Sequence, residues 1–143
     1  MKSNQNINEM IKEHYGYDND ETLEFISNPR NQDVISNADK LANSTIVVEI
    51  VESHGCNSQH KVGDKFYLDG SGNVLANRCP KKMCIFALSE LDKFVFAINE
   101  LIYAGCEPND LRFKRLGCCD VGLKCGGWGN IVMEVSVKER NQE

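Results

Sequence analysis

The pattern of apolar positions changes near residue 45, and this change divides the chain into two parts. Before it, apolar residues recur at helical spacing, and Asn28 followed by Pro29 is a typical helix start. After it, Thr45 begins a run of β-branched residues of the kind that favours a strand. We therefore predict a helical N-terminal appendage over residues 1–44 and a second, cysteine-rich domain over residues 45–143.

The second domain shows the periodicities of a sheet and one long helix. From Leu91 to Ile102 the apolar residues follow an i, i+3, i+4, i+7 pattern, with Ser89 as a cap and Gly105 as the end signal. Runs typical of strands lie at residues 45–52, 65–68, 111–116 and 131–138. The order ββαββ predicts an α+β fold, in which a small sheet of about four strands is packed by one amphipathic helix. Because only one long crossover is available, we expect mostly antiparallel pairing.

Composition and charge narrow the classes of partner. The 143 residues include 16 basic and 21 acidic side chains, a formal net charge of -5, whereas proteins that follow a phosphate backbone are usually basic. No run approaches the ~18 apolar residues of a membrane span, and the polar start lacks the apolar core of a signal peptide. We therefore expect a cytoplasmic protein with neither a nucleic-acid nor a membrane partner.

The chain is rich in cysteine, and all seven cysteines lie in the second domain. Structural disulfides are rare in a reducing compartment, and an odd count fits a closed disulfide framework poorly. Two explanations remain, namely metal or cluster ligation by thiolates and the packing of cysteine as a small apolar side chain. The cysteines are Cys56, Cys79, Cys84, Cys106, Cys118, Cys119 and Cys125.

Most of these thiols, and one histidine, lie in irregular segments that follow a strand or precede the helix. If the first and third strands were neighbours, these segments would meet at one end of the sheet. Thiolate and imidazole groups both suit zinc, so zinc is the first choice of cofactor, an iron–sulfur cluster the second, and no cofactor a third reading. The spacings lack paired C-x2-C knuckles. The predicted metal ligands are Cys56, His60, Cys84, Cys118 and Cys119.

Two other functions stay open. Cys56, His60 and Asp64 could act as thiol nucleophile, base and orienting group, and Cys119 of the Cys118-Cys119 pair is a second candidate nucleophile. Alternatively, the cysteines are structural and the chain is an interaction or oligomerisation domain whose acidic appendage docks a protein partner or a second copy.

One motif pair resembles a known family. Cys56-x3-His60-Lys61-Val62-Gly63-Asp64-x-Phe66, followed by Pro80-x3-Cys84-x2-Ala87-Leu88, is similar to small, uncharacterised, cysteine-containing proteins common in anaerobic bacteria and archaea. The resemblance covers about residues 45–138, and it implies functional positions at Cys56, His60, Cys84 and one of Cys118 or Cys119. The chain departs from the pattern by its appendage, by Lys82-Met83 in place of a glycine before Cys84, and by additional cysteines. These departures leave the ligand set open.

Together, these features favour a small metal-binding protein of the cytoplasm, an accessory or redox subunit in anaerobic metabolism. A protein partner or homo-oligomer is expected. The alternatives are a thiol-dependent enzyme and an interaction domain, and the residues specify neither reaction nor substrate.

Overall fold

The structure is a computed structural model that describes residues 4–141. The chain separates into two compact units, which divide between Asn37 and Ala38. The first unit contains α1 (Asn4–Tyr15), α2 (Asn19–Ser27) and α3 (Pro29–Ser36). The second contains α4 (Ala38–Ala42), β1 (Ser44–His54), β2 (Lys65–Asp69), α5 (Ile85–Tyr103), β3 (Arg115–Gly117) and β4 (Asn130–Glu139). The second unit also contains three short 3-10 segments in its connections, η1 (Ala76–Arg78), η2 (Pro108–Asp110) and η3 (Leu123–Cys125).

The helices of the first unit begin where local sequence signals predict. Asp18 caps α2 through a reciprocal capping box with Glu21, in which each side chain accepts the other residue's backbone N–H at 2.9 Å. Asn28 caps α3 by accepting the N–H of Arg30 at 3.0 Å, and Pro29 occupies the first helical position. Both caps depend only on residues close in the sequence, and the start of α3 at Asn28-Pro29 was predicted from it.

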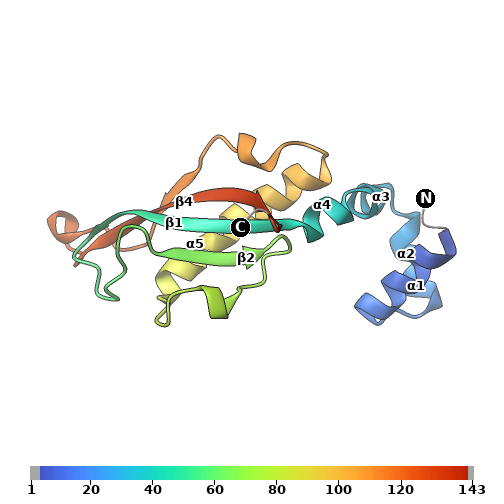
Figure 1. Cartoon of the computed structure of the whole chain (residues 1–143), viewed down its shortest axis with the longest axis horizontal. Helices are drawn as coiled ribbons and strands as arrows, with labels where there is room; N and C mark the ends of the chain where they lie inside the picture. The colour runs from blue at the N-terminus through green and yellow to red at the C-terminus, as the bar shows by residue number, and fades with distance from the viewer. Residues whose placement is uncertain (1–3, 142–143) are drawn as a thin grey trace. The chain divides into compact units, whose positions relative to one another are not determined.

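The second unit confirms the predicted α+β class. Its four strands form one antiparallel sheet in the order β2-β1-β4-β3, and Figure 1 shows α5 lying across one face of it. The long central strands β1 and β4 pair from Ser44 opposite Glu139 to His54 opposite Asn130, with a β-bulge between Ile50 and Glu52. The third strand in sequence therefore lies at an edge, separated from the first by the fourth. This order corrects the premise that the first and third strands are neighbours.

Helix α5 supplies the apolar cover of the sheet. Its buried residues Ala87, Leu91, Phe94, Ile98 and Ile102 follow helical spacing and pack against the inward-facing positions of the strands. The helix begins at Ile85, whereas the sequence predicted a start at Ser89. The cause is tertiary, because Ala87 is 1 % exposed and extends the apolar face by one turn toward the N-terminus. Within residues 4–141 no helix, α5 included, is long and apolar enough to span a membrane.

Within the second unit, hydrogen bonds join the short helix α4 to the sheet and to the segment after α5. The Ser44 hydroxyl donates to the Lys40 carbonyl at 2.7 Å, and the Arg140 N–H donates to the Asn43 carbonyl at 2.7 Å. Lys40 also reaches the Cys106 carbonyl beyond the end of α5. Leu41 packs against the core cluster. The compact unit therefore starts at Ala38, before β1.

Side chains satisfy several strand groups along β2 and β4 that no neighbouring strand reaches. On the outer edge of β2, the Cys79 sulfur accepts the N–H of Tyr67 at 3.2 Å. On β4, where β3 is too short to cover the whole strand, the Asn109 amide both donates to and accepts from the Val137 backbone at 2.8 Å. The Cys118 sulfur similarly accepts the N–H of Ile131 at 3.5 Å. These groups are thus satisfied without a further strand.

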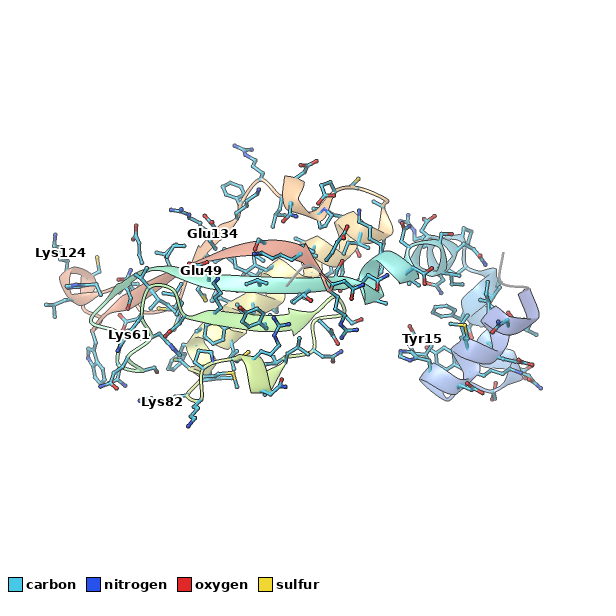
Figure 2. All side chains as sticks on the ribbon, in the orientation of Figure 1. Tyr15, Glu49, Lys61, Lys82, Lys124 and Glu134 are labelled. Carbon is cyan, nitrogen blue, oxygen red and sulfur yellow. The ribbon has the colours of Figure 1, made fainter. Side chains whose placement is uncertain are left out.

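A row of four charged residues crosses the sheet on the face opposite α5. Glu49 and Glu134 face each other in the β1–β4 pairing, an arrangement that is unfavourable for like charges. Lys65 lies 3.7 Å from Glu49 on one side, and Arg115 donates to Glu134 at 2.7 Å on the other. Figure 2 shows Glu49 and Glu134 over the middle of the sheet. Each carboxylate therefore has a cation on its outer side.

Gly70 lies where α4, β2 and α5 meet, and a substitution there tests how closely these elements pack. A Cβ at Gly70 would lie 1.9 Å from the Leu41 carbonyl oxygen, and the Gly70 carbonyl accepts from Asn99 on α5. We expect Gly70→Ala to lower the free energy of unfolding by about 2–3 kcal/mol, because α4 must move to admit the methyl group. Chemical denaturation measures this change.

Gly117→Ala is the matched control, since its Cβ would lie an ordinary 3.7 Å from the Ile131 carbonyl oxygen. It should change the free energy of unfolding by less than about 1 kcal/mol. Equal effects of the two substitutions would show that the close approach of Gly70 to Leu41 is absent in solution.

Candidate functional site

The start of α5 places Cys84 in a position that sequence reasoning did not assign to it. Cys84 is the N-cap residue, with extended backbone angles of φ -75° and ψ 128°, and its carbonyl accepts the N–H groups of Ala87 and Leu88 at 3.1 and 3.0 Å. The free N–H groups of a first helical turn carry partial positive charge. A half-buried thiol thus lies where a negative charge is favoured.

Three donors act on the Cys84 sulfur. Burial by itself raises the pKa of the thiol, but hydrogen bonding from the Ser58 hydroxyl and the N–H groups of Ala87 and Phe86 outweighs it, so the pKa lies below its usual value. The sulfur does not close the tight hydrogen bond of a regular N-cap. The lowered pKa therefore reflects donors near the sulfur rather than a closed capping bond.

His60 links this helix start to the loop between β1 and β2. It is 4 % exposed, its Nε2 accepts the backbone N–H of Cys84 at 3.3 Å, and its ring meets that of Phe66 edge to face. Nδ1 lies 3.9 Å from a carboxylate oxygen of Asp64. Burial lowers the pKa of His60, the Asp64 carboxylate opposes this shift, and Lys82 adds to it. A neutral imidazole is what the contact with Cys84 requires, because only an unprotonated Nε2 accepts a hydrogen bond.

The turn that carries His60 is held by hydrogen bonds from nearby side chains and backbone groups. The Asp64 carboxylate accepts the N–H of Lys61 at 2.9 Å. Gly63 has a φ of 93°, which suits glycine, and its N–H donates to the Ile50 carbonyl at 2.9 Å. The Ser53 hydroxyl donates to the His60 carbonyl at 2.6 Å. The H-K-V-G-D element therefore forms a tight turn that enters β2 and directs the imidazole toward α5.

The predicted metal centre is not formed. Among residues 4–141, no three or more His, Cys, Asp or Glu side chains are grouped so that they could hold a metal ion. The prediction of zinc or an iron–sulfur cluster as cofactor was therefore wrong. The loops after β1 and β3 do meet, since a Cβ at Gly129 would lie 2.1 Å from the Gly55 carbonyl oxygen, but the cysteine side chains there have other surroundings. The Cys118 sulfur, for example, accepts the N–H of Ile131.

The structure gives the five predicted ligands different surroundings. His60 and Cys84 come together through the backbone of Cys84. Cys56 is half-buried against the core cluster, and Cys118 packs there as well, with its sulfur bound to the N–H of Ile131. Cys119 is exposed. Of the proposed Cys56, His60 and Asp64 arrangement, the histidine and aspartate lie close together as expected.

Asp120 organises the glycine-rich loop between β3 and β4. Its carboxylate accepts the N–H groups of Gly122 at 2.9 Å, Trp128 at 3.0 Å and Gly129 at 3.1 Å. These hydrogen bonds hold the pKa of the Asp120 carboxyl below its usual value. Sequence reasoning missed this role, although an aspartate two residues before a glycine is a recognisable turn signal. The side chain of Trp128 itself is exposed.

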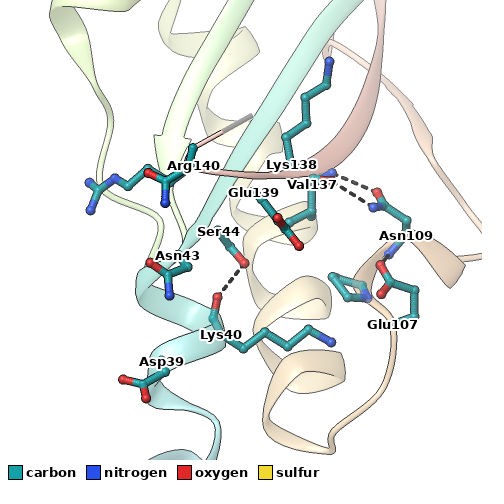
Figure 3. Close-up of a pocket in the computed structure, with 12 residues that line it drawn as sticks. Asp39, Lys40, Asn43, Ser44, Glu107, Asn109, Val137, Lys138, Glu139 and Arg140 are labelled. Carbon is teal, nitrogen blue, oxygen red and sulfur yellow. Dashed lines mark hydrogen bonds between the residues drawn. The ribbon is translucent and has the colours of Figure 1, made fainter. Parts of the chain in front are cut away.

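A hollow of about 820 Å³ lies elsewhere, among α4, η2 and the end of β4 (Figure 3). Charged side chains, including Asp39, Glu107 and Glu139, line it together with the Asn109 amide that closes the β4 edge. None of its lining residues is a cysteine or histidine. The reactive groups described above therefore lie outside this hollow.

No protein-family model, curated protein or solved structure matches the chain. The resemblance through the C-x3-H-K-V-G-D element consequently stays a prediction, and the functional argument depends on the geometry around Cys84.

The neutral state of His60 predicts how stability depends on pH. The pKa of His60 is lowered in the folded protein, so between the unfolded value near 6.5 and the folded value the unfolded chain binds more protons. The contribution of His60 to the free energy of unfolding is then fully present above pH 6.5. It decreases as the pH falls, by at most about 1.4 kcal/mol per pH unit for this one group. We expect His60→Gln to remove that part of the slope between pH 7.5 and 5 in urea denaturation.

His54→Gln is the matched control, because His54 is exposed at the end of β1. It should keep the wild-type slope. The assignment fails if the His60→Gln protein loses stability with falling pH as steeply as the wild type.

Proposed function

We propose that the protein acts through Cys84 as a nucleophilic thiolate that exchanges with disulfides. The observation that supports this most is the position of the Cys84 sulfur at the first turn of α5, next to the Ser58 hydroxyl and the N–H groups of Ala87 and Phe86. These groups favour the anionic form, and the thiolate is the form of cysteine that attacks. The proposal moves the thiol-dependent alternative from Cys56 or Cys119 to Cys84.

The site needs no general base for this chemistry. In a thiol–imidazole pair, the histidine removes the thiol proton and later returns it to the leaving group. Here His60 Nε2 is occupied by the Cys84 N–H, and burial keeps the imidazole neutral by lowering its pKa. Backbone and hydroxyl donors take over the stabilisation of the thiolate, so His60 is a positioning residue that fixes the helix start.

The same feature favours disulfide exchange over amide cleavage. An amide must receive a proton on its leaving nitrogen, and the described site has no acid placed to donate one. When a disulfide is attacked, the leaving group is a thiolate, which needs no proton. In the proposed step, the Cys84 sulfur attacks one sulfur of a small disulfide R–S–S–R, a mixed disulfide between Cys84 and R–S forms, the original S–S bond breaks, and R–S⁻ departs with its electron pair.

The surroundings of Cys84 allow a small reactant to approach. Lys81 and Lys82, which precede it, and Ile85 and Phe86, which follow it, are all exposed. The thiol itself is half-buried, which leaves one side open. Access therefore comes from solvent at the beginning of α5.

Other cysteines fit a protein whose thiols stay reduced. All seven are free of disulfides in the structure, and the sulfurs of Cys79 and Cys118 serve as acceptors at strand edges. A cytoplasmic location, where thiols are kept reduced, is part of the proposal. In this proposal Cys84 is the reactive cysteine, and other cysteines, such as Cys79 and Cys118, have structural roles.

Alkylation at neutral pH tests the proposal. We expect iodoacetamide at pH 6.5–7 to modify Cys84 before exposed Cys106, which lies past the opposite end of the same helix, because the thiolate fraction sets the rate. Peptide mapping by mass spectrometry identifies the site and its rate. Intact mass after treatment with hydroxyethyl disulfide should show one mixed disulfide, which is absent in Cys84→Ser.

The Ser58→Ala variant shows whether fast alkylation of Cys84 comes from a lowered thiol pKa or only from exposure of the thiol. The Ser58 hydroxyl contributes most to lowering the pKa of the Cys84 thiol, so we expect its removal to slow Cys84 alkylation at pH 6.5 by about tenfold. Cys106→Ser should leave the Cys84 rate unchanged. The proposal would be abandoned if Cys84 reacted no faster than Cys106, or if Ser58→Ala had no effect on a normally folded protein.

A further inference from the structure

Strand β3 lies at one edge of the sheet, and its hydrogen bonds to β4 show which of its backbone groups point outward. The Lys114 carbonyl accepts an N–H of β4 at 2.8 Å, and the Cys118 N–H donates to a β4 carbonyl at 3.2 Å. Along an antiparallel pair, residues that bond the neighbouring strand alternate with residues that do not. Leu116 therefore bonds β4 as well, whereas the N–H and C=O groups of Arg115 and Gly117 point away from the sheet.

The outer side of β3 is open to solvent. Arg115 and Gly117 are both exposed. A Cβ added at Gly117 would have one atom within 4 Å, the Ile131 carbonyl oxygen on the β4 side. Within residues 4–141 no other group bonds the outward N–H and C=O groups of these two residues. An extended segment running along β3 would therefore meet unoccupied donors and acceptors.

The other strands at the margins of the sheet have such groups covered. On β2, the Tyr67 N–H donates to the Cys79 sulfur, and the Tyr67 carbonyl accepts the N–H of Leu75 at 2.8 Å. On β4, Asn109 bonds both backbone groups of Val137, in the place that a longer β3 would take. Proteins usually cover strand edges, because an open edge invites pairing with another chain. The uncovered outer side of β3 is thus suited to the addition of a strand.

The side chains beside this edge are basic. No acidic residue lies between Asp110 in η2 and Asp120, and the Asp120 carboxylate is bound to N–H groups of its own loop. The charged residues of that interval are all cations and all exposed, namely Arg112, Lys114 and Arg115. The edge of β3 therefore carries positive charge.

This charge decides which kind of strand fits the edge. If two copies of β3 paired, their cations would gather along one seam, and like charges on neighbouring strands are destabilising. Arg115 has Glu134 as its partner, but Arg112 and Lys114 form no ion pair with a described residue. Carboxylates on an added strand would supply such partners, because opposite charges on neighbouring strands attract. The edge thus favours an acidic extended segment over a second copy of the chain.

We propose that the outer edge of β3 binds an extended, acidic segment of a partner protein, which adds a fifth strand to the four-stranded sheet. The backbone of this segment bonds the outward groups of Arg115 and Gly117, and its carboxylates lie near Arg112 and Lys114. Phe113, which is 71 % exposed, offers an apolar contact next to the strand. This inference is independent of the chemistry proposed for the start of α5.

A synthetic peptide tests the proposal on the full chain. The probe is a fluorescein-labelled hexapeptide of alternating glutamate and valine, and fluorescence anisotropy follows its binding. We expect saturable binding that weakens with added salt, because salt screens exposed charges. The amide hydrogens of Arg115 and Gly117 should exchange more slowly when the peptide is bound, since it covers them.

Two control peptides separate the backbone contribution from the charge contribution. N-methylation of every residue of the probe removes its N–H donors and keeps its charge, so we expect the affinity to fall about tenfold or more. Replacing glutamate by lysine keeps the donors and reverses the charge. This second peptide should show no saturable binding.

Substitutions in the protein locate the contact. Gly117→Pro removes one outward N–H but none of the bonds that Leu116 and Cys118 make to β4, and it should weaken peptide binding about tenfold. Gly117→Ala keeps the N–H and should bind like the wild type. Lys114→Gln should weaken binding about two- to fivefold. Lys65→Gln removes the same charge from β2, at the opposite edge of the sheet, and should have no effect.

Four outcomes would overturn the inference. The first is the absence of saturable binding by the acidic peptide. The second is equal binding of the N-methylated and unmodified peptides, which would reduce the contact to charge alone. The third is equal affinity of the Gly117→Pro and Gly117→Ala proteins. The fourth is a dimer of the protein without peptide that Gly117→Pro abolishes in sedimentation, which would identify a second copy as the occupant of this edge.

Discussion

The hydrogen bond between the N–H of Cys84 and Nε2 of His60 is the contact on which the candidate site depends. It fixes the start of α5 against the turn that leads into β2, two segments that are 24 residues apart in the sequence. A helix beginning at Ser89 would leave Cys84 in an extended segment, away from the first-turn donors. The position of the helix start therefore decides whether Cys84 has a stabilised thiolate, and the neutral imidazole of His60 holds that start in place.

Local signals predicted much of the fold. The cap at Asn28, the apolar face of α5 and the alternation along β4 depend on neighbouring residues, and each is present in the structure. The start of α5 was misjudged because serine is a favoured N-cap residue and cysteine is not, so Ser89 looked like the cap. Cys84 becomes the cap through contacts with a distant loop, which periodicity does not record.

The error in the metal prediction has the same origin. Periodicity shows which residues lie in loops, but it does not show which side chains those loops bring together, and among residues 4–141 no three or more possible ligands are grouped. Cysteine and histidine in loops suggested a shared centre. The structure instead uses Cys79 and Cys118 as sulfur acceptors for strand N–H groups, and places His60 as an acceptor for a helix N–H group. In this fold, sulfur and imidazole largely complete backbone hydrogen bonding.

Asp120 and Cys84 show how one physical arrangement has two consequences. Both groups lie among backbone N–H donors, and both have a pKa below the usual value. An ordinary carboxyl group is already ionised at neutral pH, so the donors around Asp120 change its geometry and hold the loop. An ordinary thiol is mostly protonated at neutral pH, so similar donors around Cys84 increase the fraction of the reactive form. The same kind of donor therefore holds the loop around the Asp120 carboxylate and favours the reactive form of the Cys84 thiol.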